Sequence, residues 1–572
     1  MRIVRAAPRS RALPARGLRV PGTVEPAARC IPVPGAVEEP PVTPALLLLL
    51  GAAPVDLEDP PLPDGLRILY EQPMQSFSLE RELFEDLWQQ WPAEEREEAA
   101  AADAATRYRM LLDRYGLHVD PRRGNDIPAA FSGVPGSAWT LNCLACHGGS
   151  VEGTFVPGLP NNTLMLEDLV ADVAAAKGPE RTLLEDGMLL TTMGHTVGVT
   201  EATLFGELLL GLREPNLDLK SVAGVTAAGV ANAARMAAHP EGLLPLDAPA
   251  WWQLRDKTHM YLDGSVERNH RTVMQFALGI NDLVFQDEVR AVLLNGEPEE
   301  LVELFGEKRA ASLLAMRATA TSDESFERDV VRSFRDAGLL ERAALLRRVR
   351  TNGITGEEVR SWDDEFEAIY DYILDLAPPA YPHPIDRDLA ERGRALFNRR
   401  CAECHGEDTG AGPAYRPQRV PLAEVGTDPL YPTALDQGFR DRLEGFLTFD
   451  GAIEVVPDAE ADLGYVAPPL RGIWATAPYL HNGSVPTLED LLDYDTRATR
   501  VEAGAHLWTF EPGAYDHDRM GLVATFLPPE ERTNDPRLHD AERRGMSAQG
   551  HDFGSRLDAE ERRALLEYLK TL

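Results

Sequence analysis

Cysteine is scarce in this sequence, with five among 572 residues. So few thiols exclude the dense disulfide framework of small secreted domains, and a chain of this length can bury hydrophobic cores without one. Long hydrophobic runs are also missing near the start. The strongest one, residues 45–53, is far shorter than the roughly 20 residues that a membrane-spanning helix needs. We therefore expect no transmembrane segment.

Basic residues are the minority charge. Lysine and arginine number 57 against 92 aspartates and glutamates, which gives a net charge of −35. Such a charge repels nucleic acids and anionic lipid surfaces, and it favours basic or neutral partners. We expect no nucleic-acid partner.

The segment before the apolar run contains six arginines and no acidic residue before Glu25, as does the charged front of an export signal. This basic region is longer than in a usual export signal, and Glu38 and Glu39 stand just before the apolar run. A start codon assigned too early would explain both departures. Cys30 falls in the same segment. We expect residues 1–65 to be a leader and a proline-rich linker.

Helical periodicity dominates the body of the chain, and the alternation typical of strands is scarce. Helical composition or amphipathic spacing occurs at residues 78–115, 165–176, 202–212, 286–294, 299–316 and 324–349. These segments predict a mainly α fold with a helical insertion in its first domain.

A break stands at residues 377–384, APPAYPHP, where four prolines in eight residues cannot continue a helix. Proline-rich segments of this kind suit an interdomain linker. The sequence therefore predicts an N-terminal domain over residues 66–376 and a C-terminal domain over residues 385–572.

Four of the five cysteines lie in two motifs of the same form, CLACH at 143–147 and CAECH at 401–405. Each motif puts two thiols three residues apart and a histidine directly after the second. Both thiols can then form thioethers with one haem while the histidine binds its iron from one side. The sequence predicts two covalently bound haem c groups, held by Cys143, Cys146, His147, Cys401, Cys404 and His405.

Zinc is the alternative ligand of such cysteines. Structural zinc sites usually bring two close ligand pairs together, whereas these pairs are far apart and each has its own histidine. The spacing therefore favours haem. Because this attachment takes place outside the cytoplasmic membrane, we expect a periplasmic or otherwise exported protein.

The order of elements around the second motif resembles a cytochrome c domain. A predicted helix ends at Cys401, a long loop follows, and the chain closes with a helix that carries an apolar face. In that family the first and last helices cross through a small residue and an aromatic ring. The resemblance implies these roles for Gly393, Phe397 and Tyr568, although Tyr568 could also be an ordinary half-buried tyrosine.

Residues 467–492, APPLRGIWATAPYLHNGSVPTLEDLL, resemble the signature that follows the second haem in bacterial di-haem cytochrome c peroxidases. Relatives of these enzymes include the methylamine-utilisation di-haem enzyme and the rubber oxygenases. The resemblance covers residues 132–158 and most of 385–572, and residues 260–276 only faintly. The matching positions are Pro469, Leu470, Arg471, Thr476, Ala477, Pro478, Tyr479, His481, Gly483, Thr487 and Leu488.

The resemblance also implies the second axial ligand of the second haem. Residues 545–554, GMSAQGHDFG, are similar to the rubber oxygenase branch, in which a histidine before the last helix binds the iron, and this implies His551. Met546 is the alternative, because cytochromes c often offer methionine in this loop. Tyr494, Met520 or no ligand also stay open.

Two further residues of the signature are candidates for the haem pocket. The resemblance puts His481 beside the haem and its propionates rather than on iron. Arg471 could pair with a propionate, since guanidinium geometry suits carboxylates, or form a surface salt bridge.

The other face of the first haem has no strongly flanked ligand, so we expect an open or displaceable position there. Each histidine of the insertion is by itself more typical of a surface or core residue: His195, His239, His259 and His270. An electron bridge between the haems could use Trp251 and Trp252, but buried tryptophans, Trp474 included, are mostly core residues.

These features favour an exported di-haem oxidoreductase of the peroxidase type, with haem 1 reactive towards hydrogen peroxide and haem 2 as an electron relay. A small electron-donor protein with a basic face would suit the acidic chain. A rubber oxygenase-like dioxygenase that uses oxygen is the nearest alternative. A non-catalytic electron-transfer cytochrome is another, and a calcium ion between the domains stays open.

Overall fold

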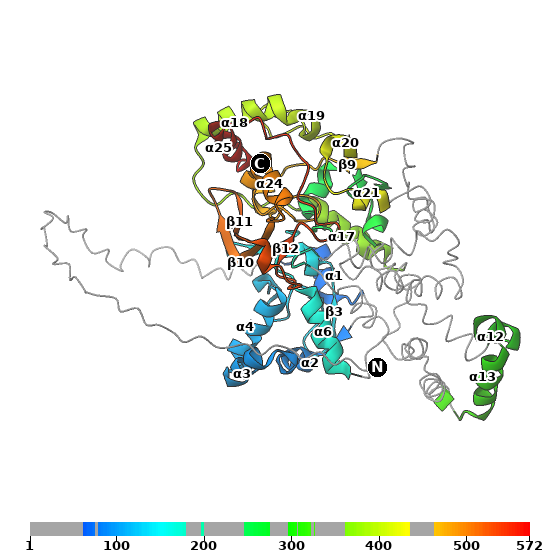
Figure 1. Cartoon of the computed structure of the whole chain (residues 1–572). Coiled ribbons are helices and arrows are strands. Elements are labelled where there is room, and N and C mark those ends of the chain that lie inside the picture. Colours follow the sequence, from blue (N-terminus) through cyan, green and yellow to red (C-terminus); the bar gives the residue numbers. More distant parts are fainter. Residues whose placement is uncertain are drawn as a thin grey trace, which may run out of the picture. The chain divides into compact units, whose positions relative to one another are not determined.

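A computed structural model describes residues 61–74, 78–178, 196–199, 245–274, 296–305, 307–321, 325–326, 361–434 and 463–572 (Figure 1). The described residues belong to one contact unit, Pro61–Leu572. Most of their regular structure is helical, which confirms the mainly α prediction. Among the helices of these ranges, none combines the length and apolar character that crossing a bilayer requires.

The N-terminal part begins with α1 (Asp64–Glu71), which packs against α17 (Asp363–Asp375). The apolar faces of the two helices supply Leu66, Leu69 and Ile369 to one buried cluster. Gly65 lies at the contact, where a Cβ atom would come within 2.4 Å of a carbonyl oxygen of α17. The close approach of these helices therefore depends on glycine.

A second core forms between a helical layer and a three-stranded sheet of order β1-β3-β2. Phe84, Tyr115, Phe131 and Trp139 fill it with aromatic rings. The elements are α2 (Arg81–Glu85), η2 (Leu87–Gln90), α3 (Ala93–Ala101), α4 (Ala104–Tyr115), η3 (Pro121–Arg123), α6 (Leu166–Lys177), β1 (Ser78–Leu79), β2 (Phe131–Ser132) and β3 (Trp139–Leu141).

The first Cys-x-x-Cys-His motif forms the short helix α5 (Leu144–His147). It leads directly into an antiparallel hairpin of β4 (Gly148–Val151) and β5 (Thr154–Pro157). Farther along come η5 (Trp251–Asp256) and the pair β6 (His259–Met260) and β7 (Val266–Glu267). The helix η5 packs against α17, which ties this segment to the N-terminal core.

The C-terminal part is built on two helices that lie side by side, α18 (Arg387–Arg400) and α25 (Ala559–Leu569) (Figure 1). At their crossing, a Cβ atom on Gly393 would come within 1.9 Å of the Ala564 carbonyl oxygen. Beside it the rings of Phe397 and Tyr568 pack with centroids 5.1 Å apart. The predicted crossing through a small residue and aromatic rings is confirmed, and Tyr568 is buried rather than half-buried.

Loops and short elements connect these two helices. Helical ones are α19 (Ala402–His405), α20 (Leu422–Val425), α21 (Leu430–Ala434), η7 (Ile473–Ala475), α23 (Leu488–Leu492), α24 (Tyr494–Glu502) and η8 (Pro529–Glu531). Strands β8 (Arg419–Pro421) and β9 (Gly464–Val466) form one pair. Strands β10 (Leu507–Asp516), β11 (Gly521–Leu527) and β12 (His539–Asp540) form a sheet of order β11-β10-β12.

The helices expected in the insertion are found where the structure describes it. Residues 165–176 correspond to α6, and residues 299–316 to α12 (Pro298–Phe305) and α13 (Glu307–Thr319). The segments 202–212 and 286–294, and almost all of 324–349, lie outside the described residues. The long β10–β11 hairpin was not expected, because its alternation is interrupted by a register shift between Phe510 and Tyr515.

Candidate haem sites

The second motif continues helix α18. The Cys401 backbone N–H donates to the Phe397 carbonyl at 2.7 Å, and the His405 N–H donates to the Cys401 carbonyl at 3.0 Å. The His405 ring then donates through Nδ1 to the Pro468 carbonyl at 3.0 Å. This hydrogen bond fixes the tautomer and leaves Nε2 available to bind iron. Burial lowers the pKa of His405, so the ring is neutral, as a metal ligand must be.

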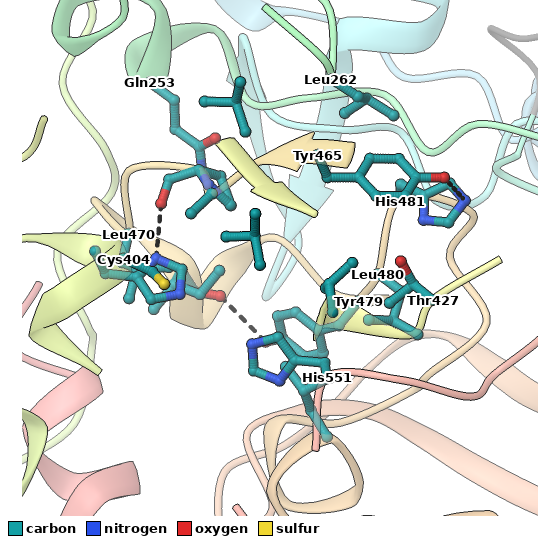
Figure 2. A pocket seen from close by; sticks show the side chains of 18 of the residues that line it. Gln253, Leu262, Cys404, Thr427, Tyr465, Leu470, Tyr479, Leu480, His481 and His551 are labelled. Carbon is teal, nitrogen blue, oxygen red and sulfur yellow. Dashed lines mark hydrogen bonds between the residues drawn. The ribbon is translucent and has the colours of Figure 1, made fainter. Parts of the chain in front are cut away.

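A cavity of about 540 Å³ adjoins this motif and is lined by Cys401, Cys404 and His405 together with many apolar side chains. His551 lines the same cavity, and Figure 2 shows its ring there with Cys404 and Leu480. Burial lowers the pKa of His551 to about 3, and the nearby His405 acts in the same direction. Two neutral imidazoles therefore face one apolar cavity.

The backbone holds His551 firmly in position. Its N–H donates to the Val425 carbonyl at 2.6 Å, and its φ is 52°. The preceding Gly550 has φ 80° and packs against Gly426, where a Cβ atom would come within 2.3 Å. The arginine Arg497 donates to the carbonyls of Ala548 and Gly550 from a buried position. The loop before α25 is thus fixed by hydrogen bonds on both sides.

His481 also lines this cavity, but its Nε2 is engaged. It lies 2.9 Å from the hydroxyl of Tyr465 (Figure 2). This hydroxyl donates to the Asp428 carbonyl at 2.7 Å. The imidazole Nε2–H is therefore the donor to the phenol oxygen. Burial lowers the pKa of His481 to about 3. This neutral ring lines the cavity with its one N–H already donated to Tyr465, and its place beside the haem stays a prediction.

The alternatives to His551 lie elsewhere. Met546 and Met520 are buried in the protein, but neither lines the cavity. Tyr494 packs its ring under the Arg497 guanidinium at 5.1 Å. Arg471 is half exposed, and its Nε binds the Asp256 carboxylate at 2.7 Å, which is the salt bridge considered as the alternative. Its pairing with a propionate stays a prediction.

The first motif is held by two asparagines. Asn142 accepts from the Leu144 N–H at 2.8 Å, which begins α5, and Asn161 donates to the Ala145 carbonyl at 3.0 Å. The His147 ring donates through Nδ1 to the Pro249 carbonyl at 3.0 Å. The hydrogen bond to a proline carbonyl is thus repeated at both motifs.

Pro249 was not recognised in the sequence. The signal was the dipeptide Ala-Pro, which occurs as Ala248-Pro249 and again as Ala467-Pro468, each carrying the carbonyl that orients a motif histidine. Two residues are too short a repeat to stand out in 572. Only the fold brings each dipeptide to its histidine.

A smaller cavity of about 140 Å³ adjoins the first motif and is lined by Cys143, Cys146 and His147. Of the four histidines considered for its other side, His259 lines the larger cavity instead, and His270 binds the Asp363 carboxylate at 2.9 Å. His195 and His239 lie outside the described residues. Side chains with heteroatoms that do line the smaller cavity include Lys257, Met260 and Thr272.

The segment that contains Trp251 and Trp252 separates the two cavities, because Pro249, Ala250 and Lys257 line both. The Trp251 ring stacks on His147 with centroids 5.1 Å apart. The Trp252 Nε1–H donates to the Arg471 carbonyl at 2.9 Å in the C-terminal part. Both tryptophans are buried in hydrophobic cores, as expected of most buried tryptophans, and an electron bridge through them stays a prediction. Trp474 packs in the C-terminal core.

The donor sets fit haem c. Each motif offers two thiols and an imidazole whose Nδ1 is already used, beside an apolar cavity, and the larger cavity is within the size range of small-molecule sites. Burial raises the pKa of Cys401 to about 12, which agrees with a thiol in apolar surroundings rather than with a thiolate that binds zinc.

The fold and the second motif define a cytochrome c-type domain that carries covalently bound haem c. Residues 388–441, which include this motif, match the family described as cytochrome c oxidase, cbb3-type, subunit III. Residues 464–502, which include His481 and the Pro468 carbonyl, match the family described as RoxA-like, cytochrome c-like.

Three curated proteins are similar to parts of the chain, and one of them is a cytochrome-c peroxidase. The chain is 31% identical over 241 residues to the uncharacterized protein y4iM of Sinorhizobium fredii, and this region covers 36% of the chain and 53% of the relative. It is 30% identical over 263 residues to y4iJ of the same organism, covering 34% and 41%. The identity to cytochrome-c peroxidase IdrP1 of a Pseudomonas species is 27% over 163 residues, covering 25% and 43%.

The matched regions span about half or less of these relatives. Together with the two family matches, they support the resemblance found in the sequence. The chain is similar to the di-haem cytochrome c peroxidase and RoxA-like family, and its second motif lies in a region similar to a cytochrome c domain.

Proposed function

We propose that this chain is an exported, peroxidase-like oxidoreductase with two haem c groups, in which the first haem is reactive and the second relays electrons. An asymmetry between the two sites carries the proposal. His551 shares a cavity with His405, whereas His147 is the only histidine among the described residues that line the smaller cavity. The larger cavity thus offers imidazoles beyond that of its motif histidine, whereas the smaller cavity offers only that of His147 among the described residues.

Bound haem would supply an iron that exchanges single electrons and, where one axial position is open, takes up a small oxidant. The protein residues prepare each site for this chemistry. His147 and His405 are oriented by the carbonyls of Pro249 and Pro468, and donation from Nδ1–H makes each imidazole a better ligand. We assign His551 as the second ligand at haem 2.

The residues around the first cavity are suited to a small polar oxidant. Its lining is mainly apolar but includes the Lys257 ammonium and the Thr272 hydroxyl. Such polar groups can hold a peroxide and move its protons, whereas the apolar walls exclude bulk water. The acidic chain supports an electron donor with a basic face, whose association would weaken as salt is added.

An oxygenase resembling the rubber enzymes is the second candidate. The match of residues 464–502 to the RoxA-like family favours it, because this match covers the segment that contributes Pro468 and His481 to the second cavity. It would use the same first site with oxygen and an apolar substrate in place of peroxide and a donor protein.

Electron paramagnetic resonance of the resting and the singly reduced protein tests the site assignment. We expect one low-spin signal from haem 2 and a high-spin signal from haem 1 in at least one of these states. Two haems that stay low-spin and take up no ligand would contradict the proposal and leave an electron carrier, with Met260 as the first residue to examine. Peroxide-dependent oxidation of a reduced donor, compared with oxygen uptake with a polyene, separates the two enzymes.

A further inference from the structure

Two histidines and one glutamate meet at a place outside both haem cavities. The Nε2 atoms of His383 and His517 are 3.2 Å apart. The Glu152 Oε1 atom lies 2.5 Å from His517 Nε2 and 3.4 Å from His383 Nε2. Three atoms that can all bind a metal therefore point to one centre, and their chemistry is that of a cation site.

The three residues come from distant parts of the sequence. Glu152 occupies the turn of the β4–β5 hairpin, directly after the first motif, with φ 49°. His383 belongs to the proline-rich segment 377–384, and His517 follows strand β10. Strands β4 and β10 are neighbours. The positive φ values of Glu152 and Gly153 are those of a two-residue hairpin turn, and this turn brings the Glu152 carboxylate to both histidines.

A hydrogen bond behind the cluster orients one of the imidazoles. The Tyr381 hydroxyl lies 3.1 Å from His517 Nδ1, so that Nε2 is the atom left for the cluster. Tyr381 packs edge-on against Trp474 at 5.3 Å, and the Trp474 Nε1–H donates to the Pro379 carbonyl at 3.0 Å. Metal-binding histidines usually have such a partner on the other ring nitrogen.

The spacing matches a tetrahedral metal site. Ligand atoms about 2.0–2.2 Å from Zn²⁺ are roughly 3.3 Å from one another, close to the 3.2 and 3.4 Å measured from His383. Glu152 Oε1 and His517 Nε2 are closer, at 2.5 Å, so binding a metal would replace their hydrogen bond and move these two atoms apart. Imidazole nitrogen suits Zn²⁺ and neighbouring transition metals, whereas calcium prefers six to eight oxygen ligands. The calcium ion considered from the sequence would thus not suit this cluster.

The cluster can be reached from solvent. The side chain of Glu152 is 35% exposed. The side chain of His383 is 50% exposed, so a hydrated metal ion can reach the cluster from solvent.

We propose that Glu152, His383 and His517 bind one Zn²⁺ ion, or a similar first-row transition-metal dication, with water in the fourth position. The metal cross-links the hairpin after the first haem motif, the proline-rich segment and the sheet of the C-terminal part. It stabilises the folded protein in proportion to its binding free energy. This site is separate from haem attachment and does not depend on the proposed activity.

The test uses the matured full-length protein without an affinity tag, treated with a chelator and dialysed. Titration calorimetry with ZnCl₂, and metal analysis after gel filtration, should give one Zn²⁺ per chain and a higher thermal midpoint. Tyr381→Phe should weaken binding about 10- to 100-fold, as loss of an outer partner does. The variants Glu152→Gln and His383→Gln should weaken it more than that.

His270→Gln is the matched control, because His270 also contacts a carboxylate, Asp363, but belongs to no three-ligand group among the described residues. It should bind Zn²⁺ as the wild type does. Haem absorbance verifies that every variant is folded and matured. Absence of stoichiometric Zn²⁺ binding by the wild type, or unchanged binding by Glu152→Gln and His383→Gln, would overturn the proposal, whatever the haem spin states are.

Discussion

His147 and Pro249 are 102 residues apart in the sequence and are joined by a hydrogen bond of 3.0 Å from the ring Nδ1 to the proline carbonyl. His405 and Pro468 repeat the contact at the same distance. A carbonyl oxygen can only accept, so each ring carries its proton on Nδ1 and presents a bare Nε2. Both motif histidines are therefore prepared as iron ligands before any cofactor arrives.

Replacing both thiols of one motif should remove one haem and spare the other. In Cys401→Ala/Cys404→Ala the thioether links at the second site cannot form, so the covalent haem content should fall from two to one per chain. Intact-protein mass spectrometry and a pyridine haemochrome assay measure this number.

Cys30→Ser is the control for this substitution, since Cys30 belongs to neither motif, and it should leave the haem content unchanged. A double variant that still carries two covalent haems would show that the second motif is not an attachment site.

Removing the imidazole of His551 should open the second haem. In His551→Gly, the low-spin signal assigned to haem 2 should convert to high-spin. Three other histidines line the described part of that cavity. His405 is the motif ligand, the Nε2 atom of His481 is engaged by Tyr465, and the Nδ1 atom of His259 lies 3.0 Å from the Thr258 hydroxyl. His551→Met should restore a low-spin haem with a higher reduction potential than the wild type. Paramagnetic resonance and a redox titration measure both effects.

Met546→Leu serves as the comparison, because Met546 is buried but does not line the cavity. Its spectrum should match that of the wild type. If Met546→Leu lost the low-spin signal and His551→Gly kept it, the second ligand of haem 2 would be Met546 and not His551.

Acid should destabilise the fold through buried histidines outside the haem sites. His539 stacks on Trp508 with centroids 3.8 Å apart, and burial lowers its pKa from 6.5 to about 3. In the unfolded chain His539 is protonated below about pH 6.5, whereas in the folded chain it stays neutral down to about pH 3. The contribution of the neutral, buried His539 to the free energy of unfolding is therefore complete above pH 6.5 and is lost as the pH falls towards 3.

The slope is roughly 1.4 kcal/mol per pH unit for one such proton. His539→Phe keeps a ring on Trp508 but cannot take up the proton. Between pH 6 and 4, the free energy of unfolding measured with urea should fall less steeply in this variant than in the wild type, by about 1.4 kcal/mol per pH unit. Above pH 7 the difference between variant and wild type should be constant. If the free energy of unfolding fell equally steeply with pH in the variant and the wild type below pH 6, a lowered pKa of His539 in the folded protein would be refuted.

The crossing of α18 and α25 should tolerate no side chain at Gly393. A Cβ atom there would come within 1.9 Å of the Ala564 carbonyl, so Gly393→Ala must push the helices apart. Overpacking of this kind costs about 1–3 kcal/mol, and thermal unfolding of the matured protein should show it as a lower midpoint.

Arg392→Ala is the control on the same helix. Arg392 forms an exposed ion pair with Glu560, and its loss should change the stability by less than about 1 kcal/mol. Equal effects of the two substitutions would mean that the helices do not cross at Gly393.

The two Cys-x-x-Cys-His motifs, the helices α18 and α25 and the helices within residues 78–115, 165–176 and 299–316 could be predicted because their signals are local. Helices α1 and α17 were not predicted. Cys143 to His147 fall within one helical turn, and the apolar spacing of residues 387–400 and 559–569 repeats along a single segment. The β10–β11 hairpin was missed because its strands are interrupted, and alternation over four or five residues is a weak signal.

The sequence by itself predicted the attachment chemistry, since the spacing within one turn indicates which cysteines and which histidine would serve each proposed haem. Tertiary structure alone decided which groups face them. The loop fold brings His551 rather than Met546 to the second cavity, long-range contacts bring two proline carbonyls to the motif histidines, and Glu152, His383 and His517 meet from three distant segments. These pairings depend on loop paths and core packing, whose energies are spread over many residues and leave no local pattern.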